Sequence, residues 1–359
     1  MSNITILSLT DRIACFHSLK PFFFIPTNHR FTYTSSPDYC LTRDRNDILI
    51  MMRQFIKPDR VDIDLLRRLR EKYRIIAFFH DDAGGGIPRL EVLPFVDLFY
   101  SKALFRDRSI YGRELYGKEL YSDYYHSKFG VSDPDARRYA VETRPEQLAK
   151  LRLSWNIGVG DFPRDQTRQR FGVLAAKTFG IPACRPFYRK PAAISRMAAK
   201  NRGIFPAHCR IGLISRPSIS YQRKLVLEAV AGDPAFLTGQ VNQRAFNREI
   251  RHSRITVSPF GWGELCLRDF EAVLNGSLLM KPDMSHLETW PDIFKPGETY
   301  VSFDWDAKEL VETTHRYLDS PDQCSRIAQD AALAYEDALT ALPQRFNSII
   351  EEIVSCPTH

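Results

Sequence analysis

Residues 258–276, which read SPFGWGELCLRDFEAVLNG, join a turn containing proline and glycine to an amphipathic helical pattern. The apolar run 255–257 before them predicts a strand that leads into the turn. We expect a helix to open near Glu264 and to end at Gly276, which suits a left-handed cap. Its polar side is formed by Glu264, Arg268, Glu271 and Asn275, at spacings of 4, 3 and 4 residues.

This strand, turn and helix suit a phosphorylated ligand. Free backbone N–H groups and the positive end of the helix dipole favour a diphosphate at a helix N-terminus. A carboxylate one or two turns further along, such as Glu271, can accept hydrogen bonds from ribose hydroxyls. The residues alone therefore indicate a nucleotide-sugar site. An ordinary amphipathic helix with a Glu264–Arg268 ion pair is the alternative.

The flanking sequence alternates between apolar runs of strand length and helical patterns. In the second half, strands are expected at 210–215, 235–238, 255–257, 277–280 and 299–303, with helices at 221–230, 246–252, 265–274, 307–318 and 321–354. In the first half, strands are expected at 4–9, 48–52, 74–79 and 96–100, with a helix over 62–73. This alternation predicts the α/β class, with two Rossmann-like, doubly wound domains that face a cleft.

The chain length of 359 residues also fits two domains. We expect an N-terminal, acceptor-side α/β domain at 1–205, a C-terminal nucleotide-sugar-binding α/β domain at 206–325, and a C-terminal helix at 326–359. A return of this helix to the N-terminal domain is one option. Because ligands bind at the carboxyl ends of parallel strands, the site is expected in the loops that face the cleft.

The composition is that of a globular protein, with 44% hydrophobic and 26% charged residues. The formal charge is +7, but Lys and Arg alternate with acids along the chain. This pattern favours anionic small substrates or an anionic membrane surface as partners, and no nucleic acid is expected. The seven cysteines form no Cys-x-x-Cys pair, which disfavours a zinc module or a disulfide framework and fits the cytoplasm. The apolar runs are too short to cross a bilayer.

The region 210–335 resembles the C-terminal domain of GT-B-fold glycosyltransferases. The resemblance lies in SPFGWGE at 258–264, in RDFEAVLNG at 268–276, and in the strand and loop at 277–283. It implies that Glu271 holds the donor ribose, that the turn approaches the phosphates or the transferred sugar, and that basic residues meet the diphosphate. The donor-binding residues that it implies are Arg216, Lys224, Gly261, Gly263, Arg268, Glu271 and Asp283.

A catalytic base is expected from the N-terminal side of the cleft. His80, Asp81 and Asp82 follow a predicted strand and precede three glycines, which would let an acceptor approach. The alternative is a polar turn in which an Asp caps a helix. The candidate catalytic residues are His80, Asp81 and Glu264. Retaining relatives often carry a second glutamate eight residues before the first, where this chain has Gly263, so the role of Glu264 and the stereochemistry stay open.

No metal and no cofactor are expected, since the nucleotide sugar is a co-substrate. Three Asp-x-Asp triplets occur, at 62–64, 133–135 and 304–306, but helix capping and turn formation account for them better than metal binding. The basic face of the 62–74 helix is a candidate contact with anionic lipid at the inner face of the membrane. A solvated helix face is the alternative.

The sequence therefore predicts a metal-independent glycosyltransferase, a hexosyl- or related transferase. It would move a sugar from a nucleotide-sugar donor to a glycan or a lipid-linked acceptor, with surface polysaccharide biosynthesis as the expected setting. Three alternatives remain open: a nucleotide-sugar epimerase or hydrolase of the same fold, a protein that binds sugar nucleotides without turnover, and a basic factor associated with nucleic acid.

Overall fold

The structure is a computed structural model that describes residues 1–9, 13–52, 61–80, 84–134, 139–189 and 193–357. The N-terminal half is built around a six-stranded sheet in which every neighbouring pair is parallel. The order of its strands is β2 (Arg30–Thr34), β1 (Asn3–Leu7), β3 (Ile48–Met52), β4 (Ile75–His80), β5 (Leu98–Ser101) and β7 (Leu151–Leu153). Every residue of β3 and β4 is buried, as expected for central strands of a parallel sheet.

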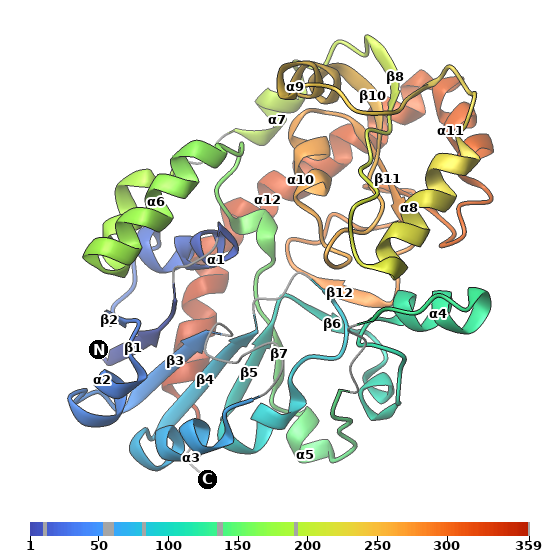
Figure 1. The fold of residues 1–359 in the computed structure, drawn as a ribbon. Coiled ribbons are helices and arrows are strands. Elements are labelled where there is room, and N and C mark those ends of the chain that lie inside the picture. Colours follow the sequence, from blue (N-terminus) through green and yellow to red (C-terminus); the bar gives the residue numbers. More distant parts are fainter. Residues whose placement is uncertain (10–12, 53–60, 81–83, 135–138, 190–192, 358–359) are drawn as a thin grey trace.

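The C-terminal half holds a second parallel sheet, of five strands. Its order is β13 (Val301–Phe303), β11 (Leu278–Pro282), β10 (Ser253–Val257), β8 (Phe205–His208) and β9 (Phe236–Leu237). Figure 1 shows the two sheets in separate halves of the molecule. The predicted α/β class with two parallel, doubly wound sheets is confirmed. A short antiparallel pair, β6 (Ala103–Phe105) with β12 (Leu287–Thr289), joins segments from the two halves.

Helices and 3-10 turns surround both sheets. In the first half these are α1 (Ile13–Phe24), α2 (Pro37–Thr42), α3 (Ile63–Lys72), η2 (Leu90–Phe95), η3 (Arg108–Gly112), α4 (Leu120–Phe129), α5 (Pro145–Leu148), η4 (Ile157–Val159), α6 (Gln166–Phe179), η5 (Ile181–Phe187) and α7 (Ile194–Ala198). In the second half they are α8 (Pro217–Ala229), α9 (Gln243–His252), α10 (Leu267–Leu274), α11 (Leu310–Leu318) and α12 (Pro321–Val354). Among helices in the described ranges, none is both long and apolar enough to span a membrane.

Helix α12 contributes to the cores of both halves. Near its start, Cys324 and Ile327 pack into the core around the C-terminal sheet. Near its end, Phe346 and Ile350 pack with Ile4 and other side chains of the N-terminal sheet. Figure 1 shows the helix running diagonally from one half to the other. This 34-residue helix thus holds the two sheets together, because it buries apolar surface against each of them.

Several of the expected element boundaries are wrong, among them the starts of α8 and α9, which begin four and three residues earlier than expected, at Pro217 and Gln243. The strand expected at 210–215 lies earlier, at β8, and 210–215 is irregular with Ile214 99% exposed, because β8 supplies the partner that β10 needs. Helix α10 begins at Leu267 instead of near Glu264, because Asp269 accepts a hydrogen bond from the backbone N–H of Cys266 at 2.8 Å and caps the helix there. Helix α11 begins at Leu310, three residues later than expected.

Candidate functional site

The turn between β10 and α10 lies over a buried polar network. Asp269 is fully buried, accepts a hydrogen bond from the Ser258 hydroxyl at 2.6 Å, and pairs with the Lys281 Nζ at 3.1 Å. Burial raises the pKa of Asp269, and the Lys281 ammonium opposes the rise. Lys281 comes from β11, so the neighbouring strand and the helix start are fixed to each other. This network gives the turn a defined shape at the carboxyl end of the sheet.

A cavity of about 280 Å³ opens beside this turn, and we call it the turn cavity. It is lined by turn residues that include Gly261 and Trp262, by Arg223 of α8, by Arg268 of α10 and by His17 of α1. Because His17 belongs to the N-terminal half, the cavity lies between the halves. Arg223 donates hydrogen bonds to the carbonyls of Gly212 at 2.8 Å and Phe260 at 3.3 Å, which hold its guanidinium at the turn.

A larger cavity, of about 910 Å³, lies along the other end of α10, and we call it the Glu271 cavity. Its lining includes Glu271, Arg268 and Asn275 of α10 together with Arg164 and Arg189 from the N-terminal half. Glu271 pairs with Arg164 at 3.4 Å. Burial raises the pKa of Glu271, while the Arg164 and Arg268 guanidiniums oppose the rise. An ionised Glu271 would present acceptor oxygens to a ligand in this cavity.

Of the residues that the structure describes, Arg268 is the one that lines both cavities. Its Nη2 donates to the carbonyl of Arg210 at 2.9 Å, and its guanidinium lies 5.9 Å from the centre of the Phe246 ring. The two contacts hold the charge between the helix start and Glu271. The predicted residues Gly261, Arg268 and Glu271 are thus brought to one side of the cleft. Gly263 is buried in the turn, where its carbonyl accepts from the Gly261 N–H at 3.0 Å.

Glu264 takes a different place. It is fully buried, and its Oε2 accepts a hydrogen bond from the backbone N–H of Gly85 at 2.7 Å. Its Oε1 lies 3.8 Å from Nε2 of His286. Burial acts to raise the pKa of Glu264, but the His286 imidazole and the Gly85 amide outweigh it, so the pKa lies below its usual value. Neither cavity has Glu264 among the described residues that line it.

Arg216 lies in this same contact between the halves and does not line the turn cavity. It pairs with the fully buried Glu119 at 2.9 Å and also donates to the Tyr121 hydroxyl. Burial raises the pKa of Glu119 even though Arg216 and Lys118 oppose the rise. The sequence pattern did not single out Glu119, because its partner lies on the opposite half of the molecule.

The remaining predicted residues lie apart from the two cavities. Lys224 is exposed and pairs with Glu228 at 3.5 Å on the outer side of α8. Asp283 follows β11 and accepts from the Ser285 hydroxyl at 2.5 Å. His80 ends β4, buried beside the Phe99 ring at 5.8 Å. Asp81 and Asp82 lie outside the described residues.

His17 is a cavity residue that the sequence analysis missed. Its Nδ1 accepts a hydrogen bond from the Asp161 N–H at 2.7 Å, which leaves the proton on Nε2. That Nε2 is buried and has no hydrogen-bond partner among the described residues. Burial, together with the nearby Lys102, Arg164 and Lys20, lowers the pKa of His17 to about 3. A neutral imidazole with a free N–H therefore borders the turn cavity.

The Asp-x-Asp triplets have structural roles in the described residues. Asp62 caps α3 by accepting from the Leu65 N–H, as predicted. Asp133 accepts from both the backbone and the hydroxyl of Ser218 at the start of α8. Asp306 is not the cap of α11; it pairs with Lys128 and Lys308, each at 2.8 Å. Within the described ranges, no three His, Cys, Asp or Glu side chains are grouped to hold a metal ion.

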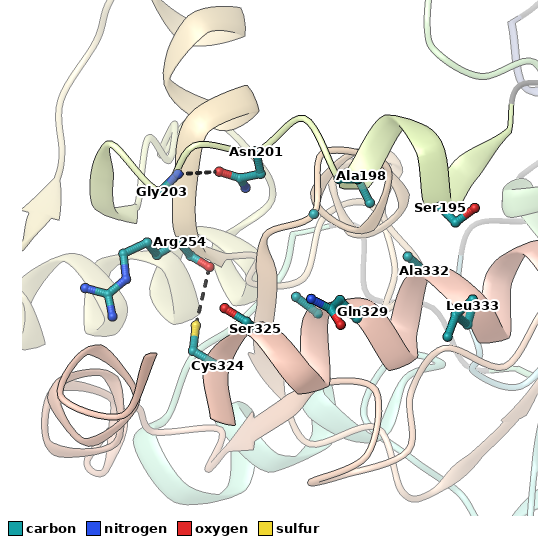
Figure 2. Close-up of a pocket in the computed structure, with 13 residues that line it drawn as sticks. Ser195, Ala198, Asn201, Gly203, Arg254, Cys324, Ser325, Gln329, Ala332 and Leu333 are labelled. Atoms are coloured by element: carbon teal, nitrogen blue, oxygen red, sulfur yellow. Dashed lines mark hydrogen bonds between the residues drawn. The ribbon is translucent and has the colours of Figure 1, made fainter. Parts of the chain in front are cut away.

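A third cavity, of about 350 Å³, lies where the segment after α7 meets α12. Most of the side chains that line it are small, and Figure 2 shows the larger Arg254, Asn201 and Gln329 beside them. Asn201 accepts from the Gly203 N–H at 2.8 Å, and Cys324 contacts the Arg254 carbonyl. Arg254 is the one charged residue of the lining in the described part of the chain.

Comparisons with known proteins give one family match and several similar solved structures. Residues 206–342 match the family model of glycosyl transferase-like proteins. This match confirms the resemblance of the C-terminal region to glycosyltransferases. It spans both β10 and α10, and so includes the turn, Arg268 and Glu271. None of the curated proteins matches the chain.

Several solved structures are similar at low sequence identity. One is an alpha-glucosyltransferase in complex with UDP-glucose and DNA containing an abasic site, at 10% identity and a TM-score of 0.49, covering 99% of this chain and 100% of that one. Another is HepE of Anabaena in complex with UDP-glucose, at 8% identity and a TM-score of 0.46, covering 98% and 100%. A third is the pneumococcal O-GlcNAc transferase GtfA in complex with UDP and GlcNAc. It is 10% identical, has a TM-score of 0.42, and the match covers 89% of this chain and 60% of that one.

Proposed function

We propose that this protein is a glycosyltransferase that binds a nucleotide-sugar donor across the turn cavity and the Glu271 cavity. The observation that carries the proposal is that Arg268, in the first turn of α10, lines both cavities. The diphosphate would lie at the helix start, where backbone N–H groups and the dipole favour anions. The ribose would lie at Glu271, whose carboxylate accepts hydrogen bonds from hydroxyl groups. The family match over residues 206–342 supports the glycosyltransferase part of this proposal.

The cations around the turn cavity would stabilise the leaving group. Glycosyl transfer builds negative charge on the departing diphosphate, and fixed donors at that position lower the barrier. Arg223 and Arg268 line the turn cavity and are held by backbone carbonyls, so their charges are already oriented. The free Nε2–H of His17 would add a neutral hydrogen bond from the opposite half. In this proposal the stabilising groups come from the chain itself and the reaction is metal-independent.

On the acceptor side, His80 remains our proposed base, with Asp81 as the second candidate. His80 stands at the carboxyl end of β4, next to the loop whose Gly85 contacts Glu264. For Glu264 we propose a positioning role: its carboxylate fixes this loop against the turn and does not meet the donor. The acceptor we propose is a glycan or a lipid-linked sugar, used in surface polysaccharide assembly in the cytoplasm, where the enzyme contacts the inner face of the membrane.

The first test is thermal stability of the purified protein with nucleoside diphosphates and nucleotide sugars, beginning with the uridine forms. A ligand at 100 times its dissociation constant adds about 2.7 kcal/mol to the free energy of unfolding, which shifts melting visibly. We expect one nucleotide to stabilise the wild type, Glu271→Gln to abolish the shift, and Glu228→Gln, on the exposed side of α8, to keep it. No shift with any nucleotide would overturn the proposal. Turnover of the donor without any acceptor would instead favour a hydrolase or an epimerase.

A further inference from the structure

One surface of the N-terminal half exposes large apolar side chains. Phe171, Leu174 and Phe179 of α6 are 56%, 58% and 81% exposed. Opposite them on the same helix, Val173 and Ala176 are buried. Figure 1 shows α6 at the outer edge of the molecule, beside α1. In the described part of the chain, the outward side of α6 therefore exposes three large apolar side chains among polar ones, which is uncommon for a surface that meets only water.

The segment of the chain that contains α6 is basic. Between Asp165 and Glu228 the sequence contains no Asp or Glu. Arg170 and Lys177 of α6 and Arg185 of the following η5 are exposed, and none of the three forms an ion pair with another described residue. We call this set of three apolar and three basic side chains the α6 surface.

The α6 surface adjoins the proposed active site. The first residues of α6, Gln166 and Thr167, line the Glu271 cavity together with Arg164 just before them. The helix has 14 residues and is about 21 Å long, so no part of it is more than about one helix length from the end that lines the cavity. A ligand surface that touched α6 would therefore lie next to the cleft.

We propose that the α6 surface docks onto an anionic lipid bilayer. Phe171, Leu174 and Phe179 would enter the interfacial region, and the basic side chains would meet lipid phosphates. Transfer of exposed aromatic and aliphatic side chains from water into an apolar phase is favourable. A bilayer offers such a phase, whereas a nucleic-acid backbone does not. Resting on the proposed function, this contact would bring a lipid-linked acceptor to the cleft.

The α6 surface suits a membrane better than the basic helix that the sequence suggested. In α3, Arg70 pairs with Asp97 at 2.5 Å, Lys72 donates to the carbonyl of Asp44 at 2.8 Å, and Arg67 pairs with Asp64 at 2.7 Å. These cations are already used within the chain. The apolar residues of α3 face inward, with Leu66 and Leu69 buried. Helix α3 and the residues after it keep Arg68 and Arg74 exposed, but they present no exposed apolar side chains on the scale of α6.

The experiment is flotation of the full-length protein with vesicles of phosphatidylcholine alone or of phosphatidylcholine with phosphatidylglycerol. We expect the wild type to bind only the anionic vesicles, and each cation removed to weaken binding about fivefold. Arg170→Gln/Lys177→Gln tests the charges, and Phe171→Gln/Leu174→Gln/Phe179→Gln tests the apolar side chains. The matched controls are Arg67→Gln/Arg68→Gln on α3 and Leu333→Gln, an exposed apolar residue of α12. Both controls should bind like the wild type.

Several results would overturn the docking proposal. They are absence of wild-type binding to anionic vesicles, equal binding by the α6 variants, loss of binding in the α3 control, and a wild-type dimer that the α6 substitutions convert to monomer. Retention on DNA or RNA at physiological salt, without vesicle binding, would also overturn it. The nucleotide-induced melting shift is measured on the same variants. A retained shift with lost vesicle binding separates the membrane contact from the proposed function, because none of the substituted α6 residues lines the turn cavity or the Glu271 cavity.

Discussion

Glu264 and Gly85 are joined by a hydrogen bond of 2.7 Å although 179 residues separate them in the chain. Glu264 comes from the turn of the C-terminal half, and Gly85 from the loop that follows β4 in the N-terminal half. The His286 Nε2 lies 3.8 Å from the Glu264 carboxylate, and the buried Glu119, which pairs with Arg216, is a second carboxylate nearby. The two loops that border the cleft are therefore fixed to each other by a carboxylate that water does not reach.

Replacement of Glu264 should destabilise the protein in proportion to what is left unpaired. Glu264→Ala removes the acceptor of the Gly85 N–H and leaves His286 facing no carboxylate, so we expect a loss of about 2–4 kcal/mol in the free energy of unfolding. Glu264→Gln keeps an acceptor and should lose about half as much. Urea denaturation followed by circular dichroism measures both. Equal losses in the two variants would contradict the role of the hydrogen bond.

Gly85 should tolerate no side chain while Leu287 is present. A Cβ at Gly85 would lie 2.4 Å from the Cδ1 of Leu287, which is itself buried. We expect Gly85→Ala to cost about 1–3 kcal/mol through overpacking. In the background of Leu287→Ala, the same substitution should cost much less, because the clash is gone. A double-mutant cycle of unfolding free energies gives the coupling, and additive losses would contradict the packing argument.

Two neighbouring cations of α8 should differ in their effect on donor affinity. Arg223 lines the turn cavity, whereas Lys224 is exposed and pairs with Glu228. If the diphosphate lies in that cavity, Arg223→Gln removes a hydrogen bond to a charged group and should weaken nucleotide binding about 10- to 100-fold. Lys224→Gln should leave binding within about twofold, since exposed surface pairs contribute little. Calorimetric titration with the stabilising nucleotide measures both, and similar losses would place the diphosphate elsewhere.

His17 should make the fold sensitive to mild acid. Its pKa in the folded protein is about 3, below the 6.5 of an exposed imidazole, so below pH 6.5 the unfolded chain binds one more proton than the folded protein. The free energy of unfolding should then fall by about 1.4 kcal/mol per pH unit on this account, from pH 6.5 down toward pH 3. His17→Asn keeps an acceptor for the Asp161 N–H and does not titrate.

Between pH 6.5 and 5, the wild type should therefore lose about 2 kcal/mol more than His17→Asn. Urea midpoints at half-unit pH steps, taken for both proteins, measure the difference. Parallel pH profiles would show that His17 is not held neutral by the fold.

Part of the candidate site could be predicted from local sequence. The turn and α10 follow from proline, glycine and the spacing of apolar residues, so Gly261, Arg268 and Glu271 were expected near one another and are found along one helix and its start. Helix α3 was likewise predicted almost to the residue, from Asp62 as cap and from buried residues at helical spacing. Capping and helical periodicity depend on atoms only a few residues apart, which is why sequence alone suffices for them.

The sequence by itself determined the α/β class, the strand, turn and helix around residues 258–276, and the side of α10 that carries Arg268 and Glu271. Only the tertiary structure decided that Glu264 is buried against Gly85 and that His17 borders the turn cavity. It also decided that Arg216 pairs with Glu119 and does not line that cavity. These contacts join residues from opposite halves of the molecule. They depend on how two sheets and α12 pack together, since burial and long-range hydrogen bonds arise only once distant loops have been brought into contact.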